Sequence, residues 1–191
     1  MQQRHRIISL AVLILLTYCF TPGGSLAQDN RRLTDFRERE HYTSEELGAA
    51  LFPTLQTRGV FLRSTPEASG GLLRPASVVI PVFFAVNSAD IMPRYYAELD
   101  KLGAQLTAPH YLSYSVKIEG HTDSRGAAHV NQILSEKRAQ SVKHYLVQRF
   151  SIAPERLGTE GYGPLKPLAP NTTESGRQKN RRIEIANVAQ Q

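Results

Sequence analysis

The chain has a single cysteine, no tryptophan, and no long apolar run beyond its N-terminus. One cysteine cannot form an intramolecular disulfide, so a disulfide-stapled fold is excluded, and so are zinc sites built on paired cysteines. No later segment approaches the about 20 apolar residues that a membrane-spanning helix needs. At 191 residues, the chain has room for one domain of ordinary size plus additional segments.

The N-terminus has the parts of a secretory signal peptide. Its charged start is followed by an apolar run at residues 7–20 and by small residues that end at Ala27, where a signal peptidase would cut. The apolar run is too short to span a bilayer as a helix. We therefore expect residues 1–27 to be removed before Gln28, and the mature protein to lie in the periplasm or cell envelope.

Cys19 lies inside this segment, so the expected mature chain has no cysteine. The alternative is a lipoprotein whose lipid is attached to Cys19. A lipidation box has a small residue before its cysteine, and this chain has Tyr18 there. We favour the interpretation in which Cys19 belongs to the apolar core of the signal peptide.

The net charge of +6 overstates the basic character of the mature chain. Arg4 and Arg6 belong to the expected signal peptide, which has no acidic residue, so 21 basic residues remain against 17 acidic ones, or +4. Arg177, Lys179, Arg181 and Arg182 cluster, but no aromatic platform or DNA-reading motif accompanies them. We expect no nucleic-acid partner and a mild attraction to anionic cell-wall polymers.

Residues 28–76 form a charged N-terminal extension and a linker. Residues 28–41 are dense in charge and are expected to be mobile. Thr43 to Glu46 has the pattern of a capping box that opens a short helix, which Pro53 stops. Residues 57–62 have the composition of a strand, and residues 64–75 are a Pro/Gly/Ser-rich linker. This region either adds an edge strand, contacts a partner, or spaces the domain from another part.

Residues 77–191 alternate between strand and helix patterns. Strands are predicted over residues 78–84, 112–119, 157–162 and 182–188, and helices over residues 93–107, 131–150 and 174–180. This βαβα-β-αβ order predicts the α/β class, an α+β sandwich in which helices cover one face of a small mixed sheet.

Three motifs carry the chemistry of this domain. The chain reads Glu-Gly-His-Thr-Asp-Ser-Arg-Gly at 119–126, Leu-Ser-Glu-Lys-Arg-Ala at 134–139 and Gly-Arg-Gln-Lys-Asn-Arg-Arg at 176–182. Arg138 lies at the edge of a helical apolar stripe, so its guanidinium can point back toward the helix N-terminus. Asp123 lies in the loop at that end. A carboxylate and a guanidinium that converge there suit a zwitterionic ligand.

These motifs, in this order, resemble the OmpA-like domain, the C-terminal module of outer-membrane protein A, the peptidoglycan-associated lipoproteins and flagellar stator proteins. The resemblance implies a non-catalytic protein without a cofactor, which binds peptidoglycan non-covalently and anchors itself or an envelope or outer-membrane partner to the cell wall. It also implies the ligand, the diaminopimelate of the stem peptide. Asp123 would hold its side-chain amine and Arg138 its carboxylate, for which a planar guanidinium is suited.

The resemblance implies further contacts. Asn87, Arg177 and Arg181 match positions near the ligand groove, and Arg125 would add positive charge beside it. His121, Gly126, Asn131 and Asn180 are expected to be structural: His121 fixes its loop, Asn131 caps the helix, and Asn180 braces the loop. The chain departs from many relatives at Ala85, where they have an aspartate, and at Val130, where they have a tyrosine.

Three alternatives stay open. Asp123 and Arg138 could instead form a structural ion pair, or the domain could serve mainly to dock another envelope protein. His121 and Asp123 could join a serine in a hydrolytic triad of a wall hydrolase, or join His129 in a metal site. Neither a nucleophile elbow nor a His-Glu-x-x-His motif is present, so the sequence predicts neither catalysis nor a metal.

Overall fold

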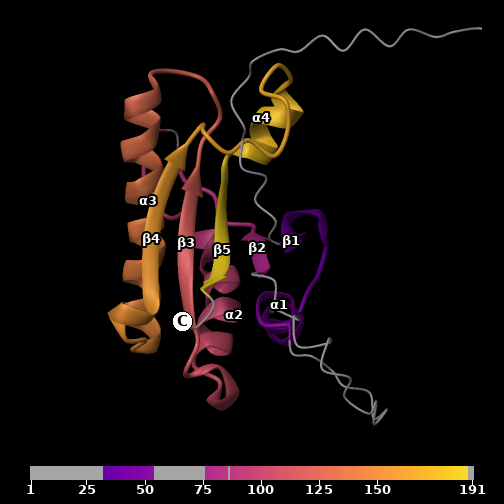
Figure 1. Ribbon diagram of the computed structural model, residues 1–191, viewed down its shortest axis with the longest axis vertical. Helices are drawn as coiled ribbons and strands as arrows, with labels where there is room; N and C mark the ends of the chain where they lie inside the picture. The colour runs from indigo at the N-terminus through magenta and orange to yellow at the C-terminus, as the bar shows by residue number, and fades with distance from the viewer. Residues whose placement is uncertain (1–31, 54–75, 86, 189–191) are drawn as a thin grey trace, which may run out of the picture.

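The computed structural model describes residues 32–53, 76–85 and 87–188, which contain one five-stranded mixed sheet (Figure 1). The strand order across the sheet is β1-β2-β5-β3-β4. Parallel pairs join β1 to β2 and β3 to β4, whereas β5 runs antiparallel to both of its neighbours. The strands are β1 (Arg32–Asp35), β2 (Ala76–Ile80), β3 (Ser115–His121), β4 (Leu157–Gly163) and β5 (Arg182–Val188).

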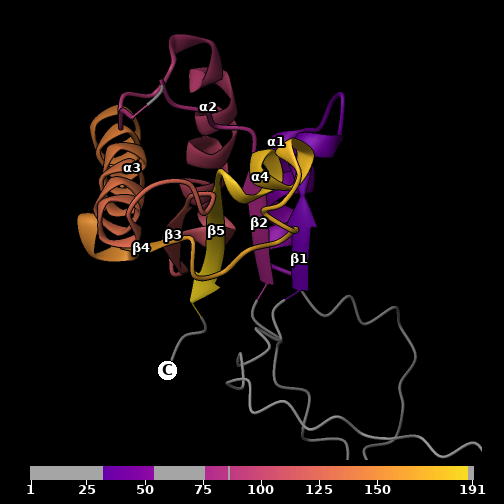
Figure 2. The ribbon, with the colours of Figure 1, turned by 90° about the horizontal axis from the view of Figure 1, so that it is seen from above.

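The long helices lie on one face of this sheet. They are α1 (Ser44–Leu51), α2 (Tyr96–Leu106) and α3 (Ala128–Phe150), as Figure 2 shows from above. The short helix α4 (Glu174–Asn180) lies beyond the ends of β3 and β4, just before β5 begins (Figure 1). The predicted α/β sandwich with a mixed sheet and helices on one face is confirmed. None of the helices in the described part of the chain is long and apolar enough to cross a membrane.

The core lies between the sheet and these helices. Val116 and Ile118 of β3 alternate with polar residues, so both point toward the helices, as the strand period requires. On α3, the side chains of Ala139, Val142 and Leu146 recur at helical spacing. They are fully buried in the same core cluster as Val116 and Ile118. This packing fixes α3 along β3 and β4.

Two glycines allow α3 to lie unusually close to the sheet. A Cβ built on Gly120 of β3 would lie less than 3.0 Å from the backbone of Ser135, and one built on Gly161 of β4 would crowd Glu136. The Ser135 hydroxyl fills the remaining space and accepts a hydrogen bond from the Gly163 N–H at 2.9 Å. Close contact here holds the first half of α3, and with it Arg138, near the end of β3.

The N-terminal segment is more ordered than expected. Arg32–Asp35 adds β1 to the sheet edge, and Phe36 is buried in the core, whereas the charge density predicted a mobile segment. The apolar Phe36 side chain outweighs the surrounding charges. The capping box is confirmed: Thr43 Oγ1 accepts from Glu46 N–H at 3.1 Å, and the Glu46 carboxylate accepts from Thr43 N–H at 2.9 Å.

The structural unit therefore begins before residue 77, because β1 and α1 pack into the same sheet and core. Of the three roles left open for residues 28–76, the edge strand is confirmed for Arg32–Asp35. The predicted signal peptide with Cys19, the predicted strand at 57–62 and the linker at 64–75 lie outside the described residues.

Several element boundaries differ from the prediction; α2, for example, begins at Tyr96 instead of 93, after a 3₁₀ turn at Pro93–Tyr95. β2 stops at Ile80 because Pro81 has no N–H to continue the ladder. β3 starts at Ser115 instead of 112, since a 3₁₀ turn at Pro109–Tyr111 precedes it and leaves Leu112 exposed. α3 starts at Ala128, three residues before the predicted cap at Asn131.

Candidate functional site

The loop between β3 and α3 is held by its own polar groups. The Asp123 carboxylate accepts a hydrogen bond from the Arg125 N–H at 2.9 Å, and Gly126 then takes a φ of +87°, which suits glycine. Asn131 is not a helix cap. Its Nδ2 donates instead to the carbonyl oxygens of Arg125 at 2.7 Å and Asp123 at 3.4 Å, so it braces the loop from the first turn of α3. The Asp123 carboxylate is therefore fixed in direction.

Asn180, at the end of α4, contacts the facing loop. It is fully buried, and its Oδ1 accepts from the N–H groups of Leu168 and Ala169 at 2.8 and 3.0 Å. Its Nδ2 donates to Asn171 Oδ1 at 2.9 Å, and that same oxygen accepts from the Ser124 N–H at 3.2 Å. The two loops at this end of the sheet are thus joined through amide side chains.

Arg181 makes the ion pair that the sequence analysis considered for Arg138. Arg181 Nη1 lies 2.5 Å from Asp123 Oδ2, and its Nη2 lies 2.8 Å from Glu174. Partial burial would lower the pKa of Arg181, but hydrogen bonds to Glu174 and Asp123 raise it overall. Asp123 is mostly buried, with 11% of its side chain exposed, so this pair is better shielded from solvent than a surface salt bridge.

Glu174 forms ion pairs with Arg125 and Arg177, the other two arginines predicted to lie near the ligand. Arg125 Nη2 and Arg177 Nη2 lie 3.0 and 2.7 Å from its Oε2. Hydrogen bonds from Arg181 and Arg177 hold the pKa of Glu174 down at about 2. Arg125 and Arg177 thus contact Glu174. Neither of these arginines lines the pocket of about 150 Å³ that is described below. Sequence reasoning missed Glu174, although its position directly after the N-cap Thr173 of α4 is a typical one for a carboxylate.

Arg138 contacts a carbonyl oxygen and an aromatic ring instead of a carboxylate. Its Nε donates to the Ser88 carbonyl at 2.9 Å, and its guanidinium lies 5.0 Å from the centre of the Phe84 ring. Within the described part of the chain, Arg138 forms no ion pair. Burial lowers its pKa most, Arg181 lowers it further, and Asp123 raises it. Arg138 therefore interacts electrostatically with both Arg181 and Asp123, although the direct contact of Asp123 is with Arg181.

A pocket of about 150 Å³ lies among these groups. It is far smaller than the roughly 300–1,000 Å³ sites of drug-sized ligands, so it admits the end of a side chain and not a whole peptide. Asn87, in the adjacent turn, is exposed and has a φ of +54°. Sequence reasoning missed Phe84, which had no signal beyond an apolar strand. The lining residues are Val82, Phe83, Phe84, His121, Arg138, Gln178, Arg181 and Arg182.

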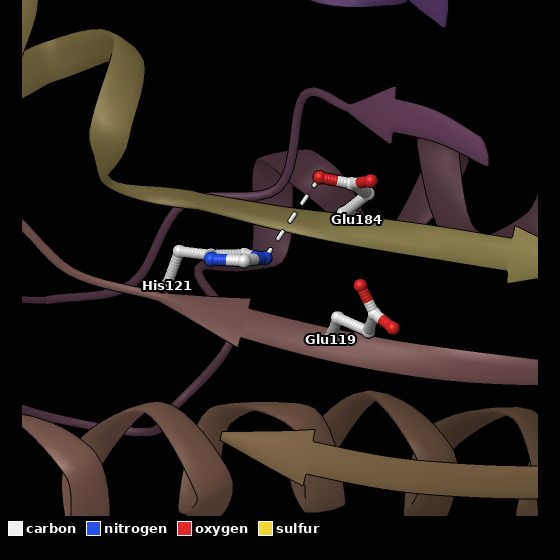
Figure 3. A group of neighbouring side chains, drawn as sticks. All are labelled: Glu119, His121 and Glu184. Atoms are coloured by element: carbon white, nitrogen blue, oxygen red, sulfur yellow. Dashed lines mark ion pairs between the residues drawn. The ribbon is translucent and has the colours of Figure 1, made fainter. Parts of the chain in front are cut away.

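Behind the pocket lies a buried polar cluster on the sheet face away from the long helices (Figure 3). Glu119 and His121 project from β3 toward Glu184 on β5, and His121 Nε2 lies 3.8 Å from Glu184 Oε2. Glu184 also accepts from the Ser77 hydroxyl at 2.7 Å and lies 3.2 Å from the Arg182 guanidinium. The His121 ring stacks on Tyr162, 5.4 Å away.

Glu119, His121 and Glu184 are the single group within residues 32–53, 76–85 and 87–188 whose ligand atoms are close enough to hold a metal ion. The Glu184 oxygens already accept from Ser77 and lie 3.2 Å from the Arg182 guanidinium, whose positive charge opposes a metal ion. We therefore interpret the cluster as a structural network between β2, β3 and β5. The alternative metal site of His121, Asp123 and His129 is not assembled: His129 is exposed on α3, and the Asp123 carboxylate contacts Arg125 and Arg181. The His121 ring lies 3.8 Å from Glu184, whereas the Asp123 carboxylate contacts Arg125 and Arg181.

Fold and site together define an α/β sandwich with a small cationic pocket beyond the ends of β3 and β4. The model of the OmpA family matches residues 83–181, just over half of the chain, and the chain belongs to that family. This confirms the resemblance read from the motifs.

Individual relatives are similar to this chain over somewhat more than half of its length. Omp38, an outer membrane protein of Acinetobacter baumannii, is 37% identical over 112 residues, which are 59% of this chain and 31% of the relative. The peptidoglycan-binding protein ArfA of Mycobacterium tuberculosis is 38% identical over 105 residues, 55% of this chain and 31% of its own length. The match thus spans about a third of these relatives.

Solved structures agree on the fold. A MotB-like protein from Desulfovibrio vulgaris superposes with a TM-score of 0.54 at 27% identity, covering 61% of this chain and 75% of that one. The peptidoglycan-associated lipoprotein of Burkholderia pseudomallei gives 0.51 at 26% identity, covering 56% and 88%.

Proposed function

We propose that this protein binds peptidoglycan non-covalently through the diaminopimelate of its stem peptide, without catalysis, and so anchors itself or an envelope partner to the cell wall. Arg138 takes the side-chain carboxylate of diaminopimelate, and Asp123 takes the amine. The protein acts as an exported component of the periplasm or envelope, after loss of residues 1–27.

The observation that supports this proposal most strongly is the environment of the Arg138 guanidinium. Its guanidinium is half-buried and lines a pocket, yet within the described residues it has carbonyl oxygens and no carboxylate as partners. Placing a cation in such a site without an anion is costly, and a ligand carboxylate would recover that cost through charge-assisted hydrogen bonds. The pocket volume of about 150 Å³ suits one carboxylate-bearing side chain.

Asp123 supplies the complementary charge. One of its oxygens accepts from the Arg125 N–H and the other from Arg181, and each carboxylate oxygen has a second lone pair for a ligand amine. Because the loop already fixes this carboxylate, the ligand need not order it on binding, which favours affinity. The names of two relatives support the proposal: ArfA is a peptidoglycan-binding protein, and the structural neighbour from Burkholderia is a peptidoglycan-associated lipoprotein.

The test compares two stem tripeptides that differ at the third residue, one with diaminopimelate and one with lysine, which lacks the side-chain carboxylate. Calorimetric titration of the purified protein should give tighter binding of the diaminopimelate peptide. Asp123→Ala and Arg138→Ala should each weaken that binding by at least about tenfold, or about 1.4 kcal/mol. Arg138→Ala should also erase most of the discrimination between the peptides.

Circular dichroism and thermal melting provide the control, since neither substitution removes a residue of the apolar core. Variants that bind both peptides normally but melt much earlier would show that Asp123 and Arg138 are structural. Equal affinity of the wild type for the two peptides would refute diaminopimelate as the determinant.

A further inference from the structure

A second hollow lies directly beside the Arg138 pocket, between α3 and the segment that leads into α2. Its volume is about 610 Å³, within the range of pockets that hold drug-sized ligands. It is lined from Ala89 to Ile91 on one side and by α3 from Lys137 to Gln148 on the other. Lys137 is the neighbour of Arg138, and Arg138 donates to the Ser88 carbonyl, so the two hollows share one stretch of chain.

The floor of this hollow contains a rigid aromatic pair. The rings of Tyr96 and Tyr145 stack with their centres 4.8 Å apart and their planes 5° from parallel. The Tyr145 hydroxyl donates to Asp100 at 2.7 Å, and burial together with this bond raises its pKa to about 12. Tyr145 is therefore held in one orientation, while Tyr96 stays 37% exposed. A fixed, partly exposed ring offers its face to aliphatic C–H groups.

The rim of the hollow is polar but carries little net charge. Among the described residues, the exposed side chains of His144 and Gln148 make no hydrogen bond to the rest of the protein. Asp90 and Lys137 contribute one charge of each sign. Amide and imidazole groups both donate and accept hydrogen bonds. This lining suits a neutral ligand with many hydroxyl and amide groups, in contrast to the cationic Arg138 pocket.

We propose that this hollow binds an N-acetylated sugar of the glycan strand that carries the stem peptide. The inference rests on the proposed function, because it takes the stem peptide to be held at Arg138. Two amino acids and the lactyl group of the sugar separate diaminopimelate from the ring, so the linker spans more than the roughly 7 Å of two extended residues. The hollow runs from Lys137, the neighbour of Arg138, to Gln148, about 16 Å along α3, so its near end lies within reach of that linker.

The sugar would add affinity because it is covalently attached to the stem peptide. Once the peptide is held at Arg138, the sugar is confined close to the hollow, and its binding becomes effectively intramolecular. Weak stacking on Tyr96 and a few hydrogen bonds from His144 and Gln148 are then enough to change the overall affinity. The expected gain is about fivefold or more over the peptide alone.

The experiment uses two probes: the free diaminopimelate tripeptide, and the same tripeptide on its N-acetylglucosamine–N-acetylmuramic acid disaccharide. Calorimetric titration of the wild type should give at least about fivefold tighter binding of the disaccharide probe. Tyr96→Ala and the double variant His144→Ala/Gln148→Ala should bring this ratio close to one, without weakening the free tripeptide. Tyr96→Phe keeps the ring and is the matched control, and it should retain the wild-type ratio.

The outcomes separate the two proposals. If both probes bind the wild type equally, or if the variants leave the ratio unchanged, the sugar site is refuted and the peptide site stands. If neither probe binds, both proposals fail. A loss of free-tripeptide binding in Tyr96→Ala would show that this ring supports the peptide site itself, and would also overturn the sugar assignment.

Discussion

Arg181 and Asp123, 58 positions apart in the chain, are joined by a contact of 2.5 Å between Nη1 and Oδ2. Arg181 lies between α4 and β5, and Asp123 lies between β3 and α3. The pair thus ties together the two segments that frame the Arg138 pocket. Arg138, in contrast, contacts carbonyl oxygens and has no carboxylate partner among the described residues.

The first prediction concerns the role of Arg181 in ligand binding. Replacing Arg181 by alanine removes positive charge beside Arg138 and frees one side of Asp123. We expect a few-fold weaker binding of the diaminopimelate tripeptide at low salt, about 0.5–1.5 kcal/mol, because Arg181 is partly exposed. The effect should shrink at high salt, which screens charges at the rim. Titrations at two salt concentrations measure it.

Arg181→Lys is the matched control, since it keeps the charge but loses the planar fork, and it should fall between the wild type and Arg181→Ala. Unchanged affinity of Arg181→Ala at low salt would assign Arg181 to structure. Tighter binding would show that Arg181 competes with the ligand amine for Asp123.

The second prediction is a loss of stability in acid that depends on Glu174. Its pKa is lowered from an ordinary 4.5 to about 2 in the folded protein by Arg181 and Arg177. A carboxyl whose folded pKa is depressed stabilises the fold above its unfolded pKa and loses that contribution as the pH falls. The stabilisation from Glu174 should therefore be complete above about pH 4.5 and disappear toward pH 2.

Thermal melts of the wild type and Glu174→Gln between pH 6 and pH 2 would measure this contribution. The difference between their melting temperatures should be largest near neutral pH and should vanish at the acid end. Glu155→Gln, at an exposed carboxylate on the 3₁₀ turn before β4, controls for the general loss of a negative charge. A difference that stays constant across this range would contradict the assignment.

The elements near the motifs were predictable because local patterns determine them. The helix at Glu174–Asn180 and the strand at Arg182–Val188 have the predicted bounds, since a cap residue starts the first and alternating apolar residues form the second. The edge strand at Arg32–Asp35 was not predictable in the same way. Its four residues are charged or polar apart from one leucine, and pairing with β2 outweighs their composition.

The site residues were predictable as a set but not as pairs. The motifs place Asp123, Arg138 and Arg181 at one end of the sheet, and the structure brings these three side chains near one another. Which arginine contacts Asp123 depends on how the α4–β5 turn packs against the β3–α3 loop, a contact between distant segments. Sequence spacing carries no information on that choice, so the alternative ion pair considered for Asp123 involved Arg138, whereas the structure pairs Asp123 with Arg181.

The third prediction concerns the close packing of α3 on β3. A methyl group at position 120 would meet the backbone of Ser135, which cannot move as a flexible side chain can. Gly120→Ala should therefore lower the free energy of unfolding by about 1–3 kcal/mol, as overpacked cores do. It should also weaken tripeptide binding, because α3 carries Arg138. Chemical denaturation and the titration above measure the two effects.

Gly158→Ala is the control on the neighbouring strand, where a Cβ would lie 3.8 Å from its nearest neighbours, an ordinary contact. It should change neither stability nor binding by much. A Gly120→Ala variant as stable as Gly158→Ala would mean that α3 can shift without cost.

The fourth prediction tests whether Asn180 holds the binding end of the molecule together. Asn180→Ala would leave the N–H groups of Leu168 and Ala169 without their acceptor in a buried position. Unsatisfied buried groups of this kind cost about 1–3 kcal/mol, so the free energy of unfolding should fall by at least about 2 kcal/mol.

Asn180→Asp separates the roles of the two side-chain atoms. Aspartate keeps an oxygen for Leu168 and Ala169 but cannot donate to the Ala169 carbonyl or to Asn171. Because ionised aspartate would also place an unpaired buried charge against the Ala169 carbonyl, it should lose at least as much stability as Asn180→Ala at neutral pH, and less at acid pH, where it is protonated. Amide hydrogen exchange should show the fastest new exchange at Leu168 and Ala169 in Asn180→Ala, because these N–H groups lose their acceptor. Their slow exchange in Asn180→Ala would show that another group replaces Asn180, and that the loop is held without it.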